Sequence, residues 1–307
     1  MVLATDDVPT SKPMVGVDIG GTNLRVALVS GDGKIVTSTR VLLNDRLPEQ
    51  VSQQVAVLIR QLEHDVATSN LRIGVGLAAM IRNGVVANAP NLGWRNVAFA
   101  EMLSQDLGDR SVRLVNDLSA AAWGERAAGA SRGCNEIFTV FVGTGVGSAI
   151  ISRGELIDGA FGVAGELGHV KVIFDGGRRC GCGDDGCLEA YAGGAQLVLR
   201  MREAGISGTA TQLEEQALAG NASARKIYFN AIEHLGLAIA NQVTVLNPQM
   251  LILGGGVLMN CPTMVQKIES IVMSRSGVAA REHLTIKIAQ LGDDSGIVGA
   301  ALLGNGC

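Results

Sequence analysis

Three cysteines and one histidine form the most chemically informative group in this sequence. Cys180, Cys182 and Cys187 lie within eight residues, and His169 precedes the first of them by eleven positions. Thiolate sulfur and imidazole nitrogen are the ligands that a tetrahedral structural zinc ion prefers, and such a site needs four of them. Glycines between the cysteines allow the backbone to turn tightly enough for several thiolates to face one volume. We therefore predict a structural zinc ion bound by His169, Cys180, Cys182 and Cys187.

A disulfide is the alternative use of these cysteines. Cys180 and Cys182 are too close in sequence to pair comfortably, and nothing in the sequence marks a secreted protein. The spacing also differs from the paired CxxC motifs of ordinary zinc ribbons. Zinc remains the favoured interpretation, with Cys134, Cys261 and Cys307 outside the cluster.

Two glycine loops, each next to an apolar segment, could bind phosphate. The segment from Asp18 to Asn23 is Asp-Ile-Gly-Gly-Thr-Asn, and the segment from Gly143 to Gly147 is Gly-Thr-Gly-Val-Gly. Successive backbone N–H groups can converge on an anion only where no Cβ intrudes. Neither loop is a P-loop, because no Gly-Lys-Ser/Thr follows, and a tight hairpin explains each loop taken alone.

Two acidic residues stand where catalytic or binding groups could be needed. Asp117 follows an apolar segment and precedes an alanine-rich one, at an expected strand-to-helix junction. There it could act as a general base, or it could cap the helix by accepting backbone N–H bonds. Glu166 lies three residues before the proposed ligand His169, so a bound metal would order it.

The elements that must position these residues form two similar halves. Residues 14–18, 23–29 and 34–41 predict an antiparallel meander, followed by alternating helices (50–66, 97–107, 118–128) and strands (71–77, 112–116). The pattern restarts with strands at 137–142 and 147–152 and a third short strand. It continues with helices at 195–203 and 222–246, strands at 250–253 and 284–290, and a last helix from 295. Gly74 to Ala79 matches GxGxxA, but Met80 to Gly84 predicts a turn in place of a helix, which excludes a Rossmann fingerprint.

Composition bounds the class of protein. The 307 residues are 47% apolar, which is enough for two packed domains. A net charge of −4 and 3% aromatic residues argue against a nucleic-acid surface. Because no run of eighteen apolar residues and no signal peptide is evident, we expect a cytoplasmic protein without a membrane partner. The 41 glycines gather in short loops and predict places where backbones approach closely.

Seven motifs in order resemble the ROK family of repressors, sugar kinases and open reading frames, over nearly the whole chain. The motifs are Asp18-Ile-Gly-Gly-Thr-Asn23, Pro90-Asn91-Leu92-Gly93-Trp94, Asn116-Asp117, Gly143-Thr-Gly-Val-Gly147, Gly165-Glu-Leu-Gly-His169, Cys180-Gly-Cys182-Gly-Asp-Asp-Gly-Cys187-Leu-Glu189 and Leu253-Gly-Gly-Gly256. The resemblance implies an α/β protein with the actin-like ATPase, hexokinase-like (ribonuclease H-like) fold, in which two domains surround a cleft. We expect an N-terminal domain at 14–117, joined by a C-terminal helix at 295–307, and a second domain at 118–294.

The resemblance also implies roles for individual residues. Asp117 matches the general base, and the residues that match sugar-hydroxyl ligands are Asn91, Asn116, Glu166, His169 and Glu189. ATP with Mg²⁺ would occupy the phosphate loops and an adenosine loop, whose residues are Asp18, Gly20, Gly21, Thr22, Asn23, Gly143, Thr144, Gly145, Gly147, Gly254, Gly255 and Gly256. Zinc would be structural, because a complete Cys3His shell leaves no open position.

The expected function is ATP-dependent phosphorylation of a hexose at its primary C6 hydroxyl. Glucose is the first choice from its frequency in the family, and N-acetylmannosamine, N-acetylglucosamine, fructose, mannose and allose stay open. Ala78-Ala79 stands where the family usually has Pro-Gly, and Ser119 where it has Asn, so the sugar is less certain than the reaction. A non-catalytic sugar sensor and a bare ATPase are the alternatives. Too few residues precede Val15 for the winged helix of a repressor, which favours the enzyme, expected as a homodimer or higher homo-oligomer.

Overall fold

The computed structural model describes residues 12–43 and 45–304, which fold as two compact α/β units. The first unit comprises the residues up to Gly133 together with those from Asp293 onward, and the second comprises Cys134–Gly292. The boundary predicted after Asp117 therefore lies too early. Helix α3 (Asp117–Ala127) packs against the last helix, α11 (Ser295–Leu303), and so belongs to the first unit.

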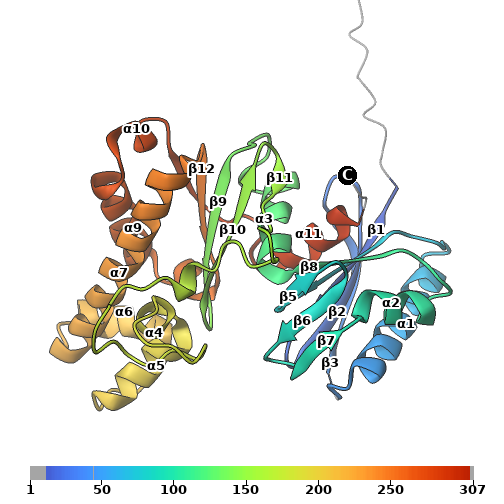
Figure 1. Cartoon of the computed structure of the whole chain (residues 1–307), viewed down its shortest axis with the longest axis horizontal. Coiled ribbons are helices and arrows are strands. Elements are labelled where there is room, and N and C mark those ends of the chain that lie inside the picture. The colour runs from blue at the N-terminus through green and yellow to red at the C-terminus, as the bar shows by residue number, and fades with distance from the viewer. Residues whose placement is uncertain (1–11, 44, 305–307) are drawn as a thin grey trace, which may run out of the picture. The chain divides into compact units, whose positions relative to one another are not determined.

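The first unit is built on a five-stranded mixed sheet with the order β3-β2-β1-β4-β8 (Figure 1). Strands β1, β2 and β3 are antiparallel neighbours, whereas β4 and β8 run parallel to β1. The strands are β1 (Met14–Ile19), β2 (Asn23–Val29), β3 (Ile35–Leu42), β4 (Ile73–Leu77) and β8 (Val112–Asn116). Helices α1 (Pro48–Asp65) and α2 (Phe99–Asp106) contribute to its core.

Glycines let α11 lie directly on the sheet of this unit. A Cβ on Gly16 of β1 would come 2.2 Å from the Ile297 carbonyl oxygen, and one on Gly74 of β4 would come 1.7 Å from that of Ala300. Neither position tolerates a side chain without moving the helix. Gly74, the first glycine of the rejected GxGxxA match, therefore serves helix packing as a close-approach site.

A small three-stranded sheet accompanies the first unit where the sequence predicted only a turn. Its antiparallel strands are β5 (Met80–Arg82), β6 (Val85–Ala89) and β7 (Trp94–Val97). The turn is shorter than predicted: Asn83 and Gly84 both have positive φ, 51° and 75°, as a tight type I′ hairpin requires. The absence of a helix here agrees with the rejection of a Rossmann fingerprint.

The second unit repeats the topology of the first, with the strand order β11-β10-β9-β12-β13. Strands β9, β10 and β11 are antiparallel neighbours, and β12 and β13 run parallel to β9. The strands are β9 (Ile137–Val142), β10 (Val146–Ser152), β11 (Glu155–Leu156), β12 (Met250–Gly254) and β13 (Thr285–Ile288). The restart of the pattern predicted near residue 137 is thus a repeated fold.

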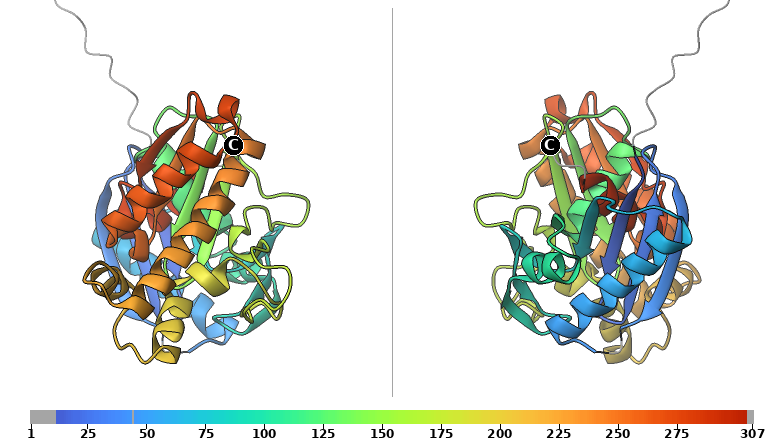
Figure 2. Two further views of the ribbon diagram at one scale, coloured as in Figure 1. Left: turned by 90° about the vertical axis from the view of Figure 1, so that its left-hand side faces the viewer. Right: turned by 90° about the vertical axis from the view of Figure 1, so that its right-hand side faces the viewer.

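Helices cover the second sheet and supply most of its core. Figure 2 shows α7 (Ala222–Leu246) and α9 (Pro262–Arg275) side by side across one face. The remaining helices are α4 (Glu189–Ala192), α5 (Gly194–Glu203), α6 (Ala210–Leu218), α8 (Gly256–Met259) and α10 (Val278–Arg281), with 3-10 turns at Leu167–His169 and Gly292–Asp294. Helices α6 and α9 were not predicted. Within the described residues, none of the helices combines the length and the apolar character that crossing a bilayer demands.

Candidate active site and metal centre

The four predicted metal ligands come together in the second unit. The ligand atoms of His169, Cys180, Cys182 and Cys187 all lie within 4.8 Å of one another. Cys182 Sγ is 3.7 Å from Cys187 Sγ, and Cys180 Sγ is 3.7 Å from His169 Nδ1. Zinc–sulfur bonds of about 2.3 Å in a tetrahedron place two sulfurs about 3.8 Å apart, so the donor set and its spacing fit zinc.

Backbone pairing and two glycines shape the loop that carries the cysteines. Lys171 pairs with Cys187 in an isolated antiparallel bridge, and Val172 N donates to Gly186 O at 2.9 Å. Gly183 and Gly186 have positive φ values of 98° and 74°. A Cβ on Gly186 would lie 1.9 Å from the Ile173 carbonyl oxygen, so only glycine fits where the two segments cross.

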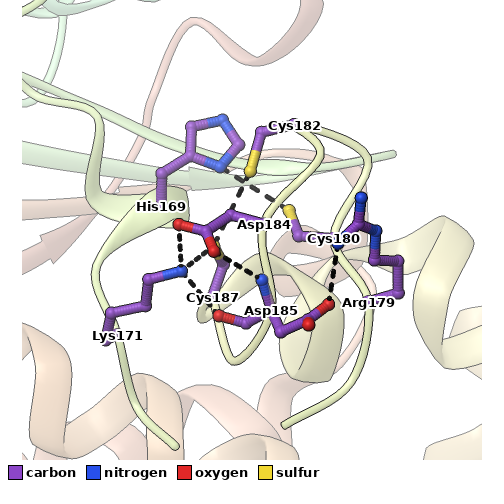
Figure 3. Close-up of polar contacts among 8 residues, drawn as sticks. All are labelled: His169, Lys171, Arg179, Cys180, Cys182, Asp184, Asp185 and Cys187. Atoms are coloured by element: carbon purple, nitrogen blue, oxygen red, sulfur yellow. Dashed lines mark hydrogen bonds and ion pairs between the residues drawn. The ribbon is translucent and has the colours of Figure 1, made fainter. Parts of the chain in front are cut away.

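The environment of Cys180 and Cys187 opposes the ionisation of these two thiols without a cation. Burial raises the pKa of the Cys180 thiol to about 12, and burial likewise raises that of Cys187. Several thiolates in one small volume also repel one another, and a bound metal ion removes both penalties. Figure 3 shows the three sulfurs and the imidazole gathered at the same point of the loop.

His169 divides its two ring nitrogens between the sulfur cluster and an acid. Nδ1 faces Cys180, whereas Nε2 lies 3.7 Å from Glu166 Oε2. The 3-10 turn Leu167–His169 sets this geometry, with His169 N donating to Glu166 O at 3.0 Å. A metal bound at Nδ1 would fix the ring and leave Nε2 directed at the half-exposed carboxylate of Glu166.

Glu189 connects the loop that carries the three cysteines to the second glycine loop. It lies two residues after Cys187, and its Oε2 accepts the Val146 backbone N–H at 2.9 Å. A Cβ on Gly145 would come 2.2 Å from the same oxygen. The absence of a side chain at Gly145 therefore allows the carboxylate to contact the loop from Gly143 to Gly147.

The third glycine loop lies at the same edge of the second sheet. Strands β9 and β12 are parallel, with Phe141 opposite Gly254, so the loops that follow them are neighbours. Gly255 has a φ of 87°, and a Cβ on it would come 2.5 Å from the Val142 carbonyl oxygen. Glycine is required here for both conformation and space.

In the first unit, the predicted residues gather at the carboxyl edge of the parallel strands. Ile19, Leu77 and Asn116 are partners across β1, β4 and β8, so the loop after Ile19 and the helix after Asn116 begin at the same edge. The loop is a tight hairpin in which Gly20 N donates to Asn23 O at 2.9 Å. These contacts bring the first glycine loop and Asp117 to one side of the sheet.

Asn91 lies beside this loop. Its turn joins β6 to β7, and a Cβ on Gly21 would come 3.4 Å from Asn91 Cβ. Arg46 bridges the two segments, because its Nη2 donates to Gly21 O at 3.0 Å while its own carbonyl accepts Trp94 Nε1–H at 2.6 Å. The exposed Asn91 side chain is thereby placed next to the glycine loop.

Asp18 is a half-buried carboxylate among cationic side chains. Burial raises its pKa, and the nearby charges of Arg25 and Arg40 partly offset that rise. Arg25 is its cross-strand partner and also donates to Asp294 Oδ1 at 2.5 Å. A divalent cation beside Asp18 would relieve the desolvation of its carboxylate.

Asn116, and not Asp117, caps helix α3. Asn116 Oδ1 accepts the N–H groups of Leu118 and Ser119 at 2.9 and 3.1 Å, and its Nδ2 donates to Ala79 O at 3.2 Å. Asp117 is the first helical residue, and its Oδ1 accepts the adjacent Leu118 N–H at 3.0 Å. The capping explanation for Asp117 was therefore wrong, because the preceding asparagine performs that role.

The model of the ROK family matches residues 14–306. The chain belongs to the ROK family. The glucokinase of Halalkalibacterium halodurans is 32% identical over 94% of each chain. Among solved structures, a ROK hexokinase from Thermus thermophilus has a TM-score of 0.84 at 28% identity, covering 95% of this chain and 97% of that one. A ROK glucokinase from Streptomyces griseus, in complex with glucose and AMPPNP, has a TM-score of 0.78 at 30% identity and covers 95% and 99%.

These ROK matches confirm the actin-like, hexokinase-like fold class that the seven motifs implied. Two polar features of the ROK chain were not predicted. One is the Arg25–Asp294 pair, whose partners are 269 positions apart and carry no shared sequence signal. The other is Lys171, two residues after His169, whose ammonium contacts the loop that carries the three cysteines. Its position two residues after the Gly165–His169 motif was a sequence signal that could have identified it.

Proposed function

We propose that this ROK protein transfers the γ-phosphoryl group of ATP to the primary C6 hydroxyl of a hexose, with glucose as the first candidate. The observation that carries the proposal is the carboxyl edge of the first sheet, where Asp117 begins helix α3 at the same edge as the first glycine loop. The similarity to a glucokinase over 94% of both chains supports the same reaction.

Asp117 would act as the general base. Its carboxylate accepts the proton of the C6 hydroxyl as that oxygen attacks the γ-phosphorus in line, and the bond to the β-phosphate oxygen breaks to release ADP. A side chain on the first turn of a helix capped by Asn116 is held by the backbone, which limits its motion. Positioning is the larger part of catalysis in phosphoryl transfer.

The glycine loops would bind the nucleotide. Mg²⁺, when bound with ATP, neutralises phosphate charge, and Asp18 would hold it through water. The loops formed by Gly20, Gly21, Thr22 and Asn23 and by Gly143, Thr144, Gly145 and Gly147 would face phosphate oxygens with backbone N–H groups, and Gly254–Gly256 would face adenosine. The N–H groups of Gly20 and Gly143 are not among these donors, because they donate to Asn23 O and Gly145 O within their own turns. AMPPNP, an ATP analogue, occupies the similar Streptomyces griseus glucokinase, which supports this use of the loops.

The hexose hydroxyls would be bound by the amide, carboxylate and imidazole groups of Asn91, Asn116, Glu166, His169 and Glu189. Asn116 has one N–H left after its bond to Ala79, and that group would serve a hydroxyl. Zinc would act through structure alone, because four ligands complete its shell. It would orient His169 directly, and Glu166 and Glu189 through their closeness to ligands.

An enzyme that consumes ATP would work where ATP is available, so we place it in the cytoplasm. A homodimer or higher oligomer remains a prediction, which light scattering coupled to size-exclusion chromatography would test. Neither point bears on the chemistry proposed above.

A coupled ADP-release assay across hexoses and amino sugars tests the function. The panel comprises glucose, mannose, fructose, allose, N-acetylglucosamine and N-acetylmannosamine. We expect sugar-dependent ADP release with the highest kcat/KM for glucose. Release without sugar would indicate an ATPase. Sugar binding without release would indicate a sensor, and either result would overturn the proposal.

A further inference from the structure

The ammonium group of Lys171 lies over the metal-binding loop with three acceptors around it. Its Nζ is 2.5 Å from Asp184 Oδ2, 2.6 Å from the Asp185 carbonyl oxygen and 3.6 Å from Cys187 Sγ (Figure 3). A lysine has three N–H donors, so each acceptor can take one. One of these acceptors is a proposed zinc ligand, and the other two belong to the turn between Cys182 and Cys187.

The backbone of Lys171 is fixed to the same loop. Its bridge with Cys187 places the two residues opposite each other, and Leu188 N donates to Val170 O at 2.9 Å on one side of that bridge. The lysine side chain therefore starts beside the cysteine and reaches forward over the turn. The backbone pairing thus fixes the position of the Lys171 Cα relative to Cys187.

The positive charge of Lys171 offsets the net negative charge of the proposed metal shell. Three thiolates outweigh the two positive charges of zinc by one, and a neutral imidazole adds none. A thiolate that accepts a hydrogen bond from an ammonium has its excess charge reduced without loss of its bond to the metal. The interaction between Lys171 and Cys187 therefore favours the metal-bound state over the metal-free state.

We propose that Lys171 is a positioning residue that retains the structural zinc, by neutralising Cys187 and by holding the Asp184–Asp185 turn closed over the site. The inference rests on the zinc site of the proposed function and extends it to the residue that controls how fast the ion is lost. Removing such a partner typically lowers metal affinity about 10- to 100-fold. Because the turn must open for zinc to leave, most of this effect falls on the rate of release.

The same loop offers a matched control. Arg179 pairs with Asp185 at 3.4 Å, and their side chains are 70% and 57% exposed, whereas that of Lys171 is 34% exposed. Among the described contacts, Arg179 makes none with a sulfur atom. Replacing Arg179 therefore removes one positive charge from the loop without touching the proposed metal shell.

The experiment compares zinc release from purified wild type, Lys171→Met, Lys171→Arg, Asp184→Asn and Arg179→Met. Zinc content is measured by mass spectrometry, and release into excess 4-(2-pyridylazo)resorcinol is followed by absorbance at constant pH and salt. We expect Lys171→Met to release zinc about 10- to 100-fold faster than wild type. Asp184→Asn should give a smaller acceleration, Lys171→Arg should recover part of the loss, and Arg179→Met should match wild type.

Each outcome decides a different point. Zinc-free wild type would overturn both the zinc site and this inference. Zinc-loaded wild type with equal release from Lys171→Met, or an equal acceleration in Arg179→Met, would overturn the inference alone. If Lys171→Met is purified without zinc while Arg179→Met retains it, the loss supports the inference. The rate of zinc release is then measured on Asp184→Asn, which keeps the lysine and every proposed zinc ligand.

Discussion

Gly145→Ala should destabilise the protein by displacing the carboxylate of Glu189. The new Cβ would lie 2.2 Å from Glu189 Oε2, well inside van der Waals contact, so the carboxylate must leave the Val146 N–H that it now accepts at 2.9 Å. A hydrogen bond to a charged group contributes about 1.5 to 3 kcal/mol. Alanine recovers about 0.4 to 1 kcal/mol by restricting the unfolded chain. We expect a net loss of about 0.5 to 2.6 kcal/mol in the free energy of unfolding.

Gly143→Ala is the matched control. Gly143 lies in the same loop, has no positive φ, and among the described residues no heavy atom lies within 4 Å of a Cβ built on it. The same chemical change should there be neutral or stabilising by up to about 1 kcal/mol. Its effect should appear in the KM for ATP, because the methyl group would stand where we place phosphate.

Urea unfolding followed by far-ultraviolet circular dichroism measures both variants. A double-mutant cycle with Glu189→Ala isolates the contact, since Gly145→Ala should lose nearly all of its effect when the carboxylate is absent. Two results would refute the reasoning: a Gly145→Ala protein as stable as Gly143→Ala, or an undiminished loss in the Glu189→Ala background.

Three further predictions concern the other polar groups of the site. Asp18→Asn should abolish ATP turnover yet raise the melting temperature at pH 7. Because burial raises the Asp18 pKa, the charged carboxylate destabilises the fold above that pKa, and the substitution removes this charge. The gain in melting temperature should vanish as the pH falls below about 4, where the aspartate is protonated in the unfolded chain as well, and an equal gain at pH 7 and below pH 4 would contradict this. Glu166→Gln should weaken sugar binding more than ATP binding by calorimetry, and equal losses would argue against its placement. Cys182→Ser should lose zinc and sugar affinity together, whereas Cys134→Ser should keep both, and a zinc-free Cys182→Ser protein with normal sugar affinity would break the link.

Sequence reasoning predicted that His169 and the three cysteines cluster and that the strand order repeats, because both features depend on local patterns. The cysteines lie within eight residues, and each half opens with apolar strands around a glycine loop. The small sheet of β5, β6 and β7 was missed because its strands have three to five residues, too few for a clear alternation. Helix α9 carried a start signal in Pro262, which stands at its first position, but that signal was not used.

The assignment of the α3 cap shows a different limit. Asn116 and Asp117 are both good capping residues, and the choice between them depends on backbone angles that composition does not reveal. Asn116 has extended φ and ψ of −60° and 143°, which makes it the cap. The Arg25–Asp294 pair depends on α11 returning to the first unit, a long-range contact without a local pattern.

The most direct test of the central claim is the turnover of Asp117→Asn with glucose and ATP, measured beside glucose binding by calorimetry. Because Asn116 caps the helix, the substitution should leave the fold and glucose affinity unchanged. We predict that turnover falls by about two to four orders of magnitude, as expected for loss of a positioned general base. Glucose-dependent ADP release close to the wild-type rate would contradict the assignment of Asp117 and the mechanism built on it.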